Sequence, residues 1–352
     1  MRIALLLLLL LSSCLSPISI QRAVLAYDRT ISDVETKMLL LNIARARHQR
    51  PTHFTAISNV AASFTFHVSA GIGPPGAGDS AYALTPSLGG SISESPTVSI
   101  VPIQGEEFTK RVLMPLDETK FLFVVAQNAN LGLVLRLVAE SITVDGKAQD
   151  EIALHKPAQR AAYVNFRTRV LHLSQLMSEN HLFVGPVNYQ EKWAGRVAIT
   201  NYDLNSLSGR DQLEIFEASK TYPHNCVYVD IRPQFPGGDY PLRGCIMLRS
   251  FTSMLGFLAR SIAEQPEFDV PKDPRTPGEP QNPVHTLEVH EANRAVANAA
   301  YEIDFEGKVY SIENADTYPK WNMQAFKLLY QVYQMTITDL AKVPAPLITI
   351  PK

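Results

Sequence analysis

The stretch that decides the fold reads Phe54-TAISNVAASFTFHVSAG-Ile72. Every even-numbered position in it except Ser58 is apolar, and the odd-numbered positions are mostly small or polar. Side chains of a β-strand point alternately to its two faces, so a period of two over this length indicates a long strand with one apolar face.

A second alternating run follows a Pro- and Gly-rich turn at residues 74–80, and its apolar positions are Tyr82, Leu84, Leu88, Ile92, Val98 and Ile100. Together the two runs predict a long amphipathic β-hairpin within residues 51–104. Pairing Ile72 with Tyr82 would set Ala70 opposite Leu84, Phe66 opposite Leu88 and Phe64 opposite Gly90. All apolar positions then share one face, and a slip by one residue would move one strand's set to the other face. Pro86 is the residue that fits this hairpin least well, because proline has no N–H to donate to the hydrogen bonds between strands.

The hairpin has the dimensions of a membrane β-strand pair. Such strands need about 9–11 residues, and Ala62–Ile72 and Tyr82–Ile92 span eleven each. The residues predicted to face lipid are Phe64, Phe66, Val68, Leu84 and Leu88, and those predicted to face a lumen are Thr65, His67 and Ser69. Because an open sheet edge is excluded in lipid, insertion requires strands from several copies. Soluble sandwiches show the same alternation, so a hairpin packed on the chain's own body or on a partner is the alternative, and His67 would then simply face solvent.

The N-terminal residues predict the cellular location of the protein. Met1-Arg2 is followed by nine apolar residues, Ile3–Leu11, which is too short a run for a permanent membrane helix and is typical of a signal peptide. Leu11-Ser12-Ser13-Cys14 resembles the lipobox of bacterial lipoproteins. The resemblance implies cleavage before Cys14 and acylation of that cysteine, which then holds the chain to membrane lipid. Leu15, in place of the Asp that marks inner-membrane retention in that family, implies the outer membrane. An ordinary secretory signal with an incidental cysteine is the alternative.

The rest of the chain predicts an α+β body with a periplasmic location. The expected parts are a signal peptide (1–13), a lipid anchor with tether and first helix (14–50), the hairpin (51–104) and the body (105–352). The tether is Leu15–Tyr27, and the first helix should begin near Asp33, after the capping-box pair Ser32 and Glu35, and end at His48.

Within the body we expect further helices at Leu131–Ile142 and Pro157–Asn180, and a surface loop at Phe268–Pro283. The longer helix has an apolar stripe formed by Tyr163, Phe166, Val170, Leu173 and Met177. Its polar residues Asn165, Arg169, His172 and Gln175 should then point away from the core.

The regions Pro96–Ile142 and Leu248–Thr336 resemble an uncharacterised group of Gram-negative lipoproteins. The resemblance rests on Pro96-Thr97-Val98-Ser99 before Gly105-Glu106-Glu107-Phe108, on Leu113-Met114-Pro115, and on Val309-Tyr310-Ser311-Ile312 before Ala325-Phe326-Lys327-Leu328-Leu329. This resemblance implies the cellular location of the protein but does not imply an activity.

Composition and motifs argue against several functions. With 32 Lys and Arg against 34 Asp and Glu, the chain lacks the basic footprint of a nucleic-acid-binding protein. It has no Gly-rich phosphate loop, HExxH, GxSxG or CxxC pattern, so we predict neither an enzyme nor a cofactor. His285 and His290, five residues apart, would lie on opposite faces of a strand and favour a surface role over a metal site. The adjacent acids Glu106-Glu107 and Asp150-Glu151 are expected on solvated faces, and Ser250 as a helix N-cap.

Two cysteines remain. Cys226 and Cys245 lie on predicted strands joined by a turn, and in an oxidising periplasm they are expected to form a disulfide, with two buried thiols as the alternative.

Two hypotheses follow for the function of the whole chain. One is an oligomeric outer-membrane channel or export component whose hairpins form a shared barrel. The other is a monomeric periplasmic scaffold or binding lipoprotein.

Overall fold

A computed structural model describes residues 15–73, 85–127, 130–146, 151–276, 278, 281–314 and 320–337. Its described residues form two compact units. One, the hairpin unit, comprises residues 15–31, 55–73 and 85–102, and the other, the body, comprises Ser32–Phe54 and the described residues after 102.

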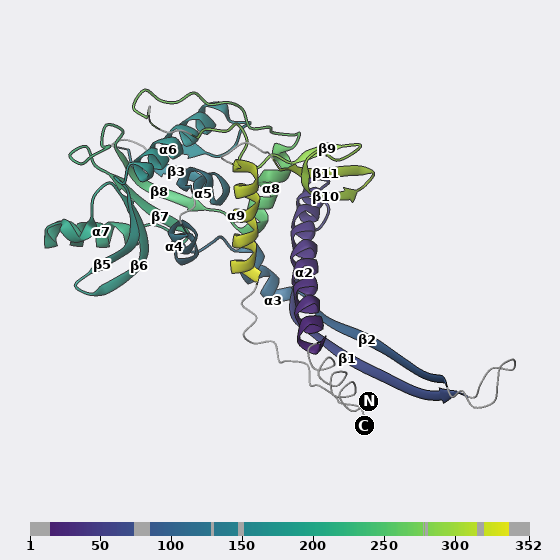
Figure 1. Cartoon of the computed structure of the whole chain (residues 1–352). Coiled ribbons are helices and arrows are strands. Elements are labelled where there is room, and N and C mark those ends of the chain that lie inside the picture. The colour runs from purple at the N-terminus through teal and green to yellow at the C-terminus, as the bar shows by residue number, and fades with distance from the viewer. Residues whose placement is uncertain are drawn as a thin grey trace. The chain divides into compact units, whose positions relative to one another are not determined.

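The hairpin unit contains the predicted pair of long strands. β1 (Thr55–Gly73) runs antiparallel to β2 (Thr85–Pro102), and the two form a two-stranded sheet (Figure 1). The register shifts once, between Ile57 and Asn59, which leaves Ser58 as an extra residue in β1. Ser58 is also the one interruption of the even-numbered apolar series, and a bulge is where such an extra residue is accommodated.

The predicted hairpin register is wrong by four residues. Ala70 pairs with Leu88 rather than Leu84, and Phe66 pairs with Ile92 rather than Leu88. A shift of four keeps every even position opposite an even one, so the alternating pattern could not distinguish the two registers.

The first helix is longer than predicted. α2 spans Leu15–Arg47, so the expected tether Leu15–Tyr27 is helical, and Ser32 and Glu35 lie inside the helix instead of capping it. The segment has no glycine, and its one early proline, Pro17, falls in the first helical turn, where proline is tolerated.

The body has the predicted α+β fold, built on a six-stranded sheet with the order β4-β3-β8-β7-β6-β5. Its strands are β3 (Ala139–Val144), β4 (Glu151–Leu154), β5 (Phe183–Tyr189), β6 (Lys192–Thr200), β7 (Cys226–Ile231) and β8 (Leu242–Leu248). Only β6 and β7 are parallel, and α7 (Gly209–Lys220) connects them, because neighbouring parallel strands need a crossover. The predicted helix Leu131–Ile142 is wrong in its second half, where Ala139–Val144 pairs with β8 and β4.

Helices and a small sheet complete the body. The remaining helices are α3 (Gly105–Phe108), continued by a π-helical turn at Thr109–Leu113, α4 (Glu118–Ala126), α5 (Leu131–Val138), α6 (Arg160–Ser178), α8 (Phe251–Ser261) and α9 (Trp321–Ile337), with a 3₁₀ turn at Leu204–Ser206. Ser250 caps α8 by accepting a hydrogen bond from the Ser253 N–H, as predicted. A three-stranded sheet has the order β10-β11-β9, with β9 at His290–Ala292, β10 at Ala299–Phe305 and β11 at Lys308–Glu313.

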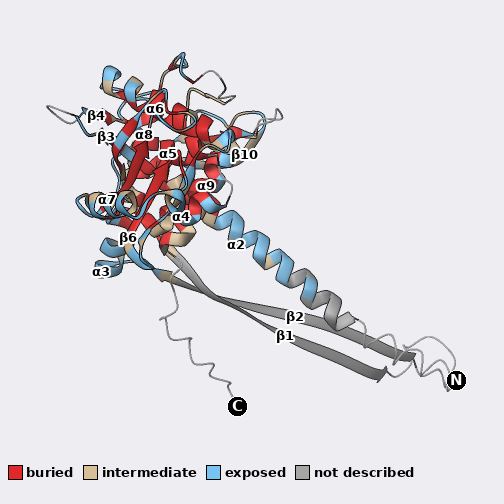
Figure 2. Cartoon of the chain, turned by 90° about the vertical axis from the view of Figure 1, so that its left-hand side faces the viewer, coloured by how far each residue is buried: buried red, intermediate tan, exposed pale blue. Residues whose placement is uncertain are grey.

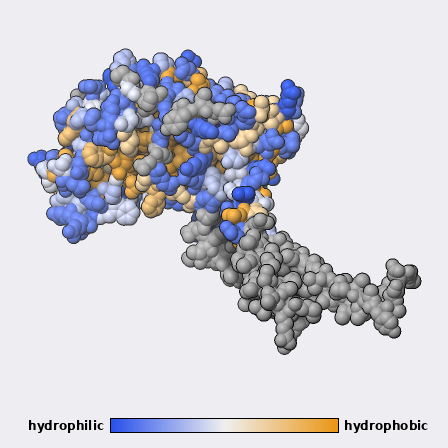
Figure 3. All heavy atoms as spheres, in the orientation of Figure 1, coloured by the Kyte–Doolittle hydropathy of each residue, from blue (hydrophilic) through white to orange (hydrophobic). Residues whose placement is uncertain are grey.

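Within the body, buried residues are concentrated in the sheet and in α5, α6, α8 and α9 (Figure 2). Hydrophilic residues cover most of the body face seen in Figure 3, and hydrophobic residues gather in patches among them. The prediction for α6 is wrong in one respect. Arg169, His172 and Gln175 are buried, and only Asn165 of the predicted outer set is exposed. α6 is buried nearly all round because segments from beyond residue 230 also cover it, as in the contact between the His172 ring and the Gly237 carbonyl.

Candidate functional site

The structure gives the predicted hairpin residues definite register positions. Those predicted to face lipid pair as Phe64 with Glu94, Phe66 with Ile92, Val68 with Gly90 and Leu88 with Ala70. Those predicted to face a lumen pair as Thr65 with Ser93, His67 with Ser91 and Ser69 with Gly89. Leu84 and Cys14 lie outside the described residues.

The corrected register moves the apolar band along β2. Glu94, expected outside the band, pairs with Phe64, so the uncharged even-numbered pairs run from Phe66 with Ile92 to Ile72 with Pro86. Between Glu94 and the last described pair, Gly73 with Thr85, each strand has ten residues, Phe64–Gly73 and Thr85–Glu94. The first three residues of the predicted β2 band Tyr82–Ile92 lie outside the described residues, and Glu94 stands at the base of the described paired segment.

Two prolines identify the free edge of β2. Pro86 pairs with Ile72 and Pro96 with Ala62, so both occupy even-numbered positions of one continuous register. Proline has no N–H for a ladder, and alternate residues of a strand direct their N–H groups to the same side. We therefore assign the even-numbered N–H groups of β2 to the edge that faces away from β1. Between the prolines, this outer edge carries the N–H groups of Leu88, Gly90, Ile92 and Glu94.

Within the body, charged residues fix the C-terminal end of α2. The Arg47 guanidinium pairs with Glu264 and Glu291 at 3.3 and 3.1 Å. The His48 ring contacts two groups: its Nε2 lies 2.6 Å from the Tyr310 hydroxyl, and its Nδ1 lies 3.2 Å from the Glu306 carboxylate. The end of the helix is thus tied both to the residues after α8 and to the small sheet.

His285 and His290, expected on opposite faces, line the same cavity of about 440 Å³ together with Arg47 and Glu291. Residues 287–291 all line this cavity, and those of them that belong to β9 also pair with β11, so the chain there is not a simple exposed strand. Among the described residues, no group of three His, Cys, Asp or Glu side chains is placed to hold a metal ion.

A buried ionic cluster, absent from the sequence predictions, surrounds Glu267. Its carboxylate lies 3.2 Å from Arg136, 3.7 Å from Arg167 and 3.5 Å from His155, and it accepts hydrogen bonds from the hydroxyl groups of Tyr163 and Thr286. All of these side chains are buried. The cluster ties the predicted surface loop to the core, because Arg136 and Arg167 also donate to the carbonyls of residues 283 and 284.

The electrostatics of this cluster follow from its burial. Burial alone would raise the pKa of Glu267, but the neighbouring charges, above all that of Arg136, hold it well below its usual range. Burial lowers the pKa of His155 to about 3, so the ring is neutral between the aromatic rings of Phe166 and Phe257. One signal could have revealed the cluster: Arg136 is the only charged residue of the apolar segment Leu131–Val138.

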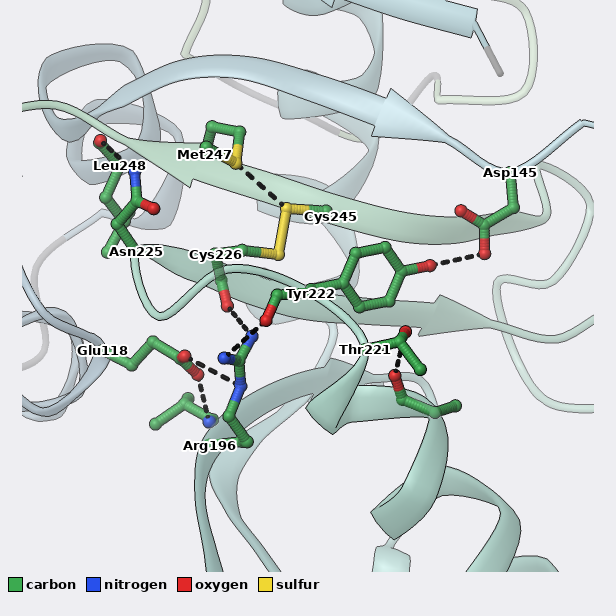
Figure 4. The surroundings of a disulfide bond; sticks show 12 residues. Glu118, Asp145, Arg196, Thr221, Tyr222, Asn225, Cys226, Cys245, Met247 and Leu248 are labelled. Atoms are coloured by element: carbon green, nitrogen blue, oxygen red, sulfur yellow. Dashed lines mark hydrogen bonds and ion pairs between the residues drawn. A yellow bond between two sulfur atoms is a disulfide. The ribbon is translucent and has the colours of Figure 1, made fainter. Parts of the chain in front are cut away.

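Cys226 and Cys245 are joined by a disulfide between β7 and β8, with their Cα atoms 5.6 Å apart (Figure 4). The two residues are diagonal neighbours, since Cys226 pairs with Met247 and Cys245 with Tyr228. Arg196 lies beside the bridge and donates to the Cys226 carbonyl, and its guanidinium pairs with Glu118 at 3.0 Å. Burial raises the pKa of Glu118 to about 7, against the lowering effect of the Val197 N–H and of Arg196.

The acidic pairs have ordinary surface partners. Glu106 and Glu107 are exposed and pair with Lys110 and Arg111 one turn further along the chain. Glu151 contacts Arg169, and Asp150 lies outside the described residues. The carboxylates of Glu106, Glu107 and Glu151 are therefore solvated.

In the described part of the chain, no helix has the length and apolarity needed to cross a membrane. Comparison of the chain with family models, with curated proteins and with solved structures gave no match.

Proposed function

We propose that this chain is a lipid-anchored outer-membrane lipoprotein without enzymatic activity, and that hairpins from several copies pair into a shared β-barrel that serves as a channel or export component. The observation that carries the proposal is the pairing of the hairpin. β1 and β2 pair with each other along nearly their whole length, and among the described strands neither has a second partner.

A two-stranded ribbon of this length is incomplete as a structure in water. An isolated hairpin is marginally stable at best, and three or more strands or a packed layer are needed to cover an apolar face. Both outer edges also carry unpaired backbone groups, which act as templates for further strands. Copies of the same hairpin, arranged side by side, would satisfy both edges and close the sheet.

The dimensions fit a membrane. The described paired segment Phe64–Gly73 with Thr85–Glu94 has ten residues in each strand, enough to supply the roughly 9–11 residues that a membrane β-strand needs. Glu94 would then lie at the membrane–water boundary, where a charge on the lipid side costs about 0–1 kcal/mol instead of the 2–4 kcal/mol expected at the midplane.

The body has a core of its own, which supports a hairpin that pairs with hairpins of other copies. Its core is formed among its own elements: α5 packs on α6, α7 packs on β5 and β6, and α8 and α9 pack together. Tyr202, Phe216 and Tyr228 belong to a buried cluster between α7 and the sheet. The alternative function, a monomeric scaffold with a packed hairpin, is favoured by one observation, the placement of Pro86 and Pro96, since prolines commonly protect a solitary edge strand.

A proline placed between Pro86 and Pro96 separates the two functions. Gly90→Pro should remove an outer-edge N–H and leave the β1–β2 ladder intact, because Gly90 has the same parity as both native prolines. We expect the variant to keep its far-UV circular dichroism and to lose its high-mass species in native electrophoresis of detergent extracts.

Gly89→Pro is the matched control. Gly89 pairs with Ser69 at an odd position, where the N–H faces β1, so this variant should damage the hairpin itself. Assembly of Gly90→Pro at the wild-type level would contradict a barrel that uses this edge.

A further inference from the structure

The body contains a second cavity, of about 510 Å³, that neither the hairpin nor the buried ionic cluster explains. α2 contributes Ser32 and Thr36 to its lining, β10 contributes Tyr301, and the rest comes from Lys320 and from α9, namely Met323, Gln324, Phe326, Lys327 and Tyr330. Its volume lies within the roughly 300–1,000 Å³ of small-molecule sites.

The walls of this cavity are mainly apolar. The rings of Tyr301 and Phe326 lie 4.8 Å apart, and Phe326 is almost completely buried, so the aromatic wall is fixed in place. Met323 lines the same space from the first turn of α9. A flexible hydrocarbon chain is the kind of group that such a wall can cover.

The charged side chains among the described lining residues of the cavity have one sign. Lys320 and Lys327 are two helical turns apart and both line it, whereas no carboxylate is among its described lining residues. The Lys320 ammonium contacts only a neutral amide in the described structure, that of Asn314 at 3.4 Å. The nearby Glu35 carboxylate is engaged by Tyr330 and Gln334.

Lys327 also lines a smaller cavity of about 230 Å³, with Gln127, Asn130, Leu133 and other neutral residues, and no carboxylate is among the described residues that line it. Two ammonium groups therefore stand at an apolar cavity whose described lining residues include no carboxylate to neutralise them. We propose that this cavity binds a single-chain amphiphile with an anionic head group, the hydrocarbon chain lying against Tyr301, Met323 and Phe326 and the head group between Lys320 and Lys327.

Photo-crosslinking tests this site in the intact membrane-bound protein. The probe is a long-chain fatty acid that carries a diazirine in its chain, and labelled peptides are identified by mass spectrometry. We expect labelling of α9, suppressed by excess oleate but not by oleyl alcohol, which has the same chain without the anionic head. The Lys320→Glu/Lys327→Glu variant should reduce labelling about tenfold, as expected for the loss of charge-assisted contacts.

Two further variants keep the test decisive. Lys192→Glu/Lys308→Glu makes the same charge change at lysines that do not line the cavity, and it should label like the wild type. Met323→Trp should block labelling by filling the cavity. Competition by an anionic lysophospholipid would identify a membrane lipid as the source of the ligand, and its failure would identify a free fatty acid. Equal labelling of wild type, Lys320→Glu/Lys327→Glu and Met323→Trp, or no labelling of α9, would overturn the proposal.

Discussion

Glu267→Gln is expected to lower the free energy of unfolding by about 3–5 kcal/mol, because removing one partner of a buried ion pair leaves the other charge uncompensated. Arg136 and Arg167 are both buried around this carboxylate, and it is the only acid paired with either of them in the described structure. Urea unfolding of the wild type and the variant, followed by circular dichroism, measures the difference.

The pH dependence has a definite sign. Since the pKa of Glu267 is held below its ordinary value of 4.5, its stabilising effect is complete above about pH 4.5 and is lost as the pH falls below it. The difference in the free energy of unfolding between the wild type and Glu267→Gln should therefore become smaller as the pH is lowered. Glu217→Gln, on an exposed pair with Lys220, is the control and should change stability by less than about 1 kcal/mol. A similar small loss for Glu267→Gln would contradict a cluster that holds the loop to the core.

Cys14→Ser is expected to abolish membrane anchoring. If the thiol of Cys14 carries the acyl chains, a serine at this position removes the site of attachment, and stable anchoring requires more than one chain. We expect the variant either to appear in the soluble periplasmic fraction or to retain its signal peptide. Fractionation followed by intact mass measurement distinguishes these outcomes from the acylated wild type.

Cys226→Ser/Cys245→Ser is the matched control, because it removes the other two cysteines and should leave fractionation unchanged. Normal acylation and membrane fractionation of Cys14→Ser would refute the lipobox assignment.

The sequence predicted those features of the fold that leave a periodic signal. The alternation from Phe54 to Ile72 identified the hairpin, and the Ser250 cap and the strands carrying Cys226 and Cys245 were also predicted correctly. The hairpin register was not, because registers that differ by an even number of residues satisfy the same alternation. The corrected register is what places Glu94 at the base of the apolar band.

Other errors arose where tertiary contacts override local pattern. Ala139–Val144 continues an apolar helix in the sequence but pairs with β8 and β4. Arg169 and His172 follow a helical polar face, yet segments distant in the chain cover that face. The Glu267 cluster combines residues up to 150 positions apart, and no spacing rule links Arg136 to Glu267, 131 positions further along the chain.

The native mass of the detergent-extracted, acylated protein tests most directly whether the hairpins form a shared barrel. Each copy supplies two strands, and the smallest membrane barrels have about eight strands, so a closed barrel needs at least about four copies. Mass photometry or light scattering corrected for detergent should therefore give a closed oligomer of at least that size, and Gly90→Pro should reduce it to one protomer. A wild-type protein that is strictly monomeric under the same extraction would contradict the shared barrel.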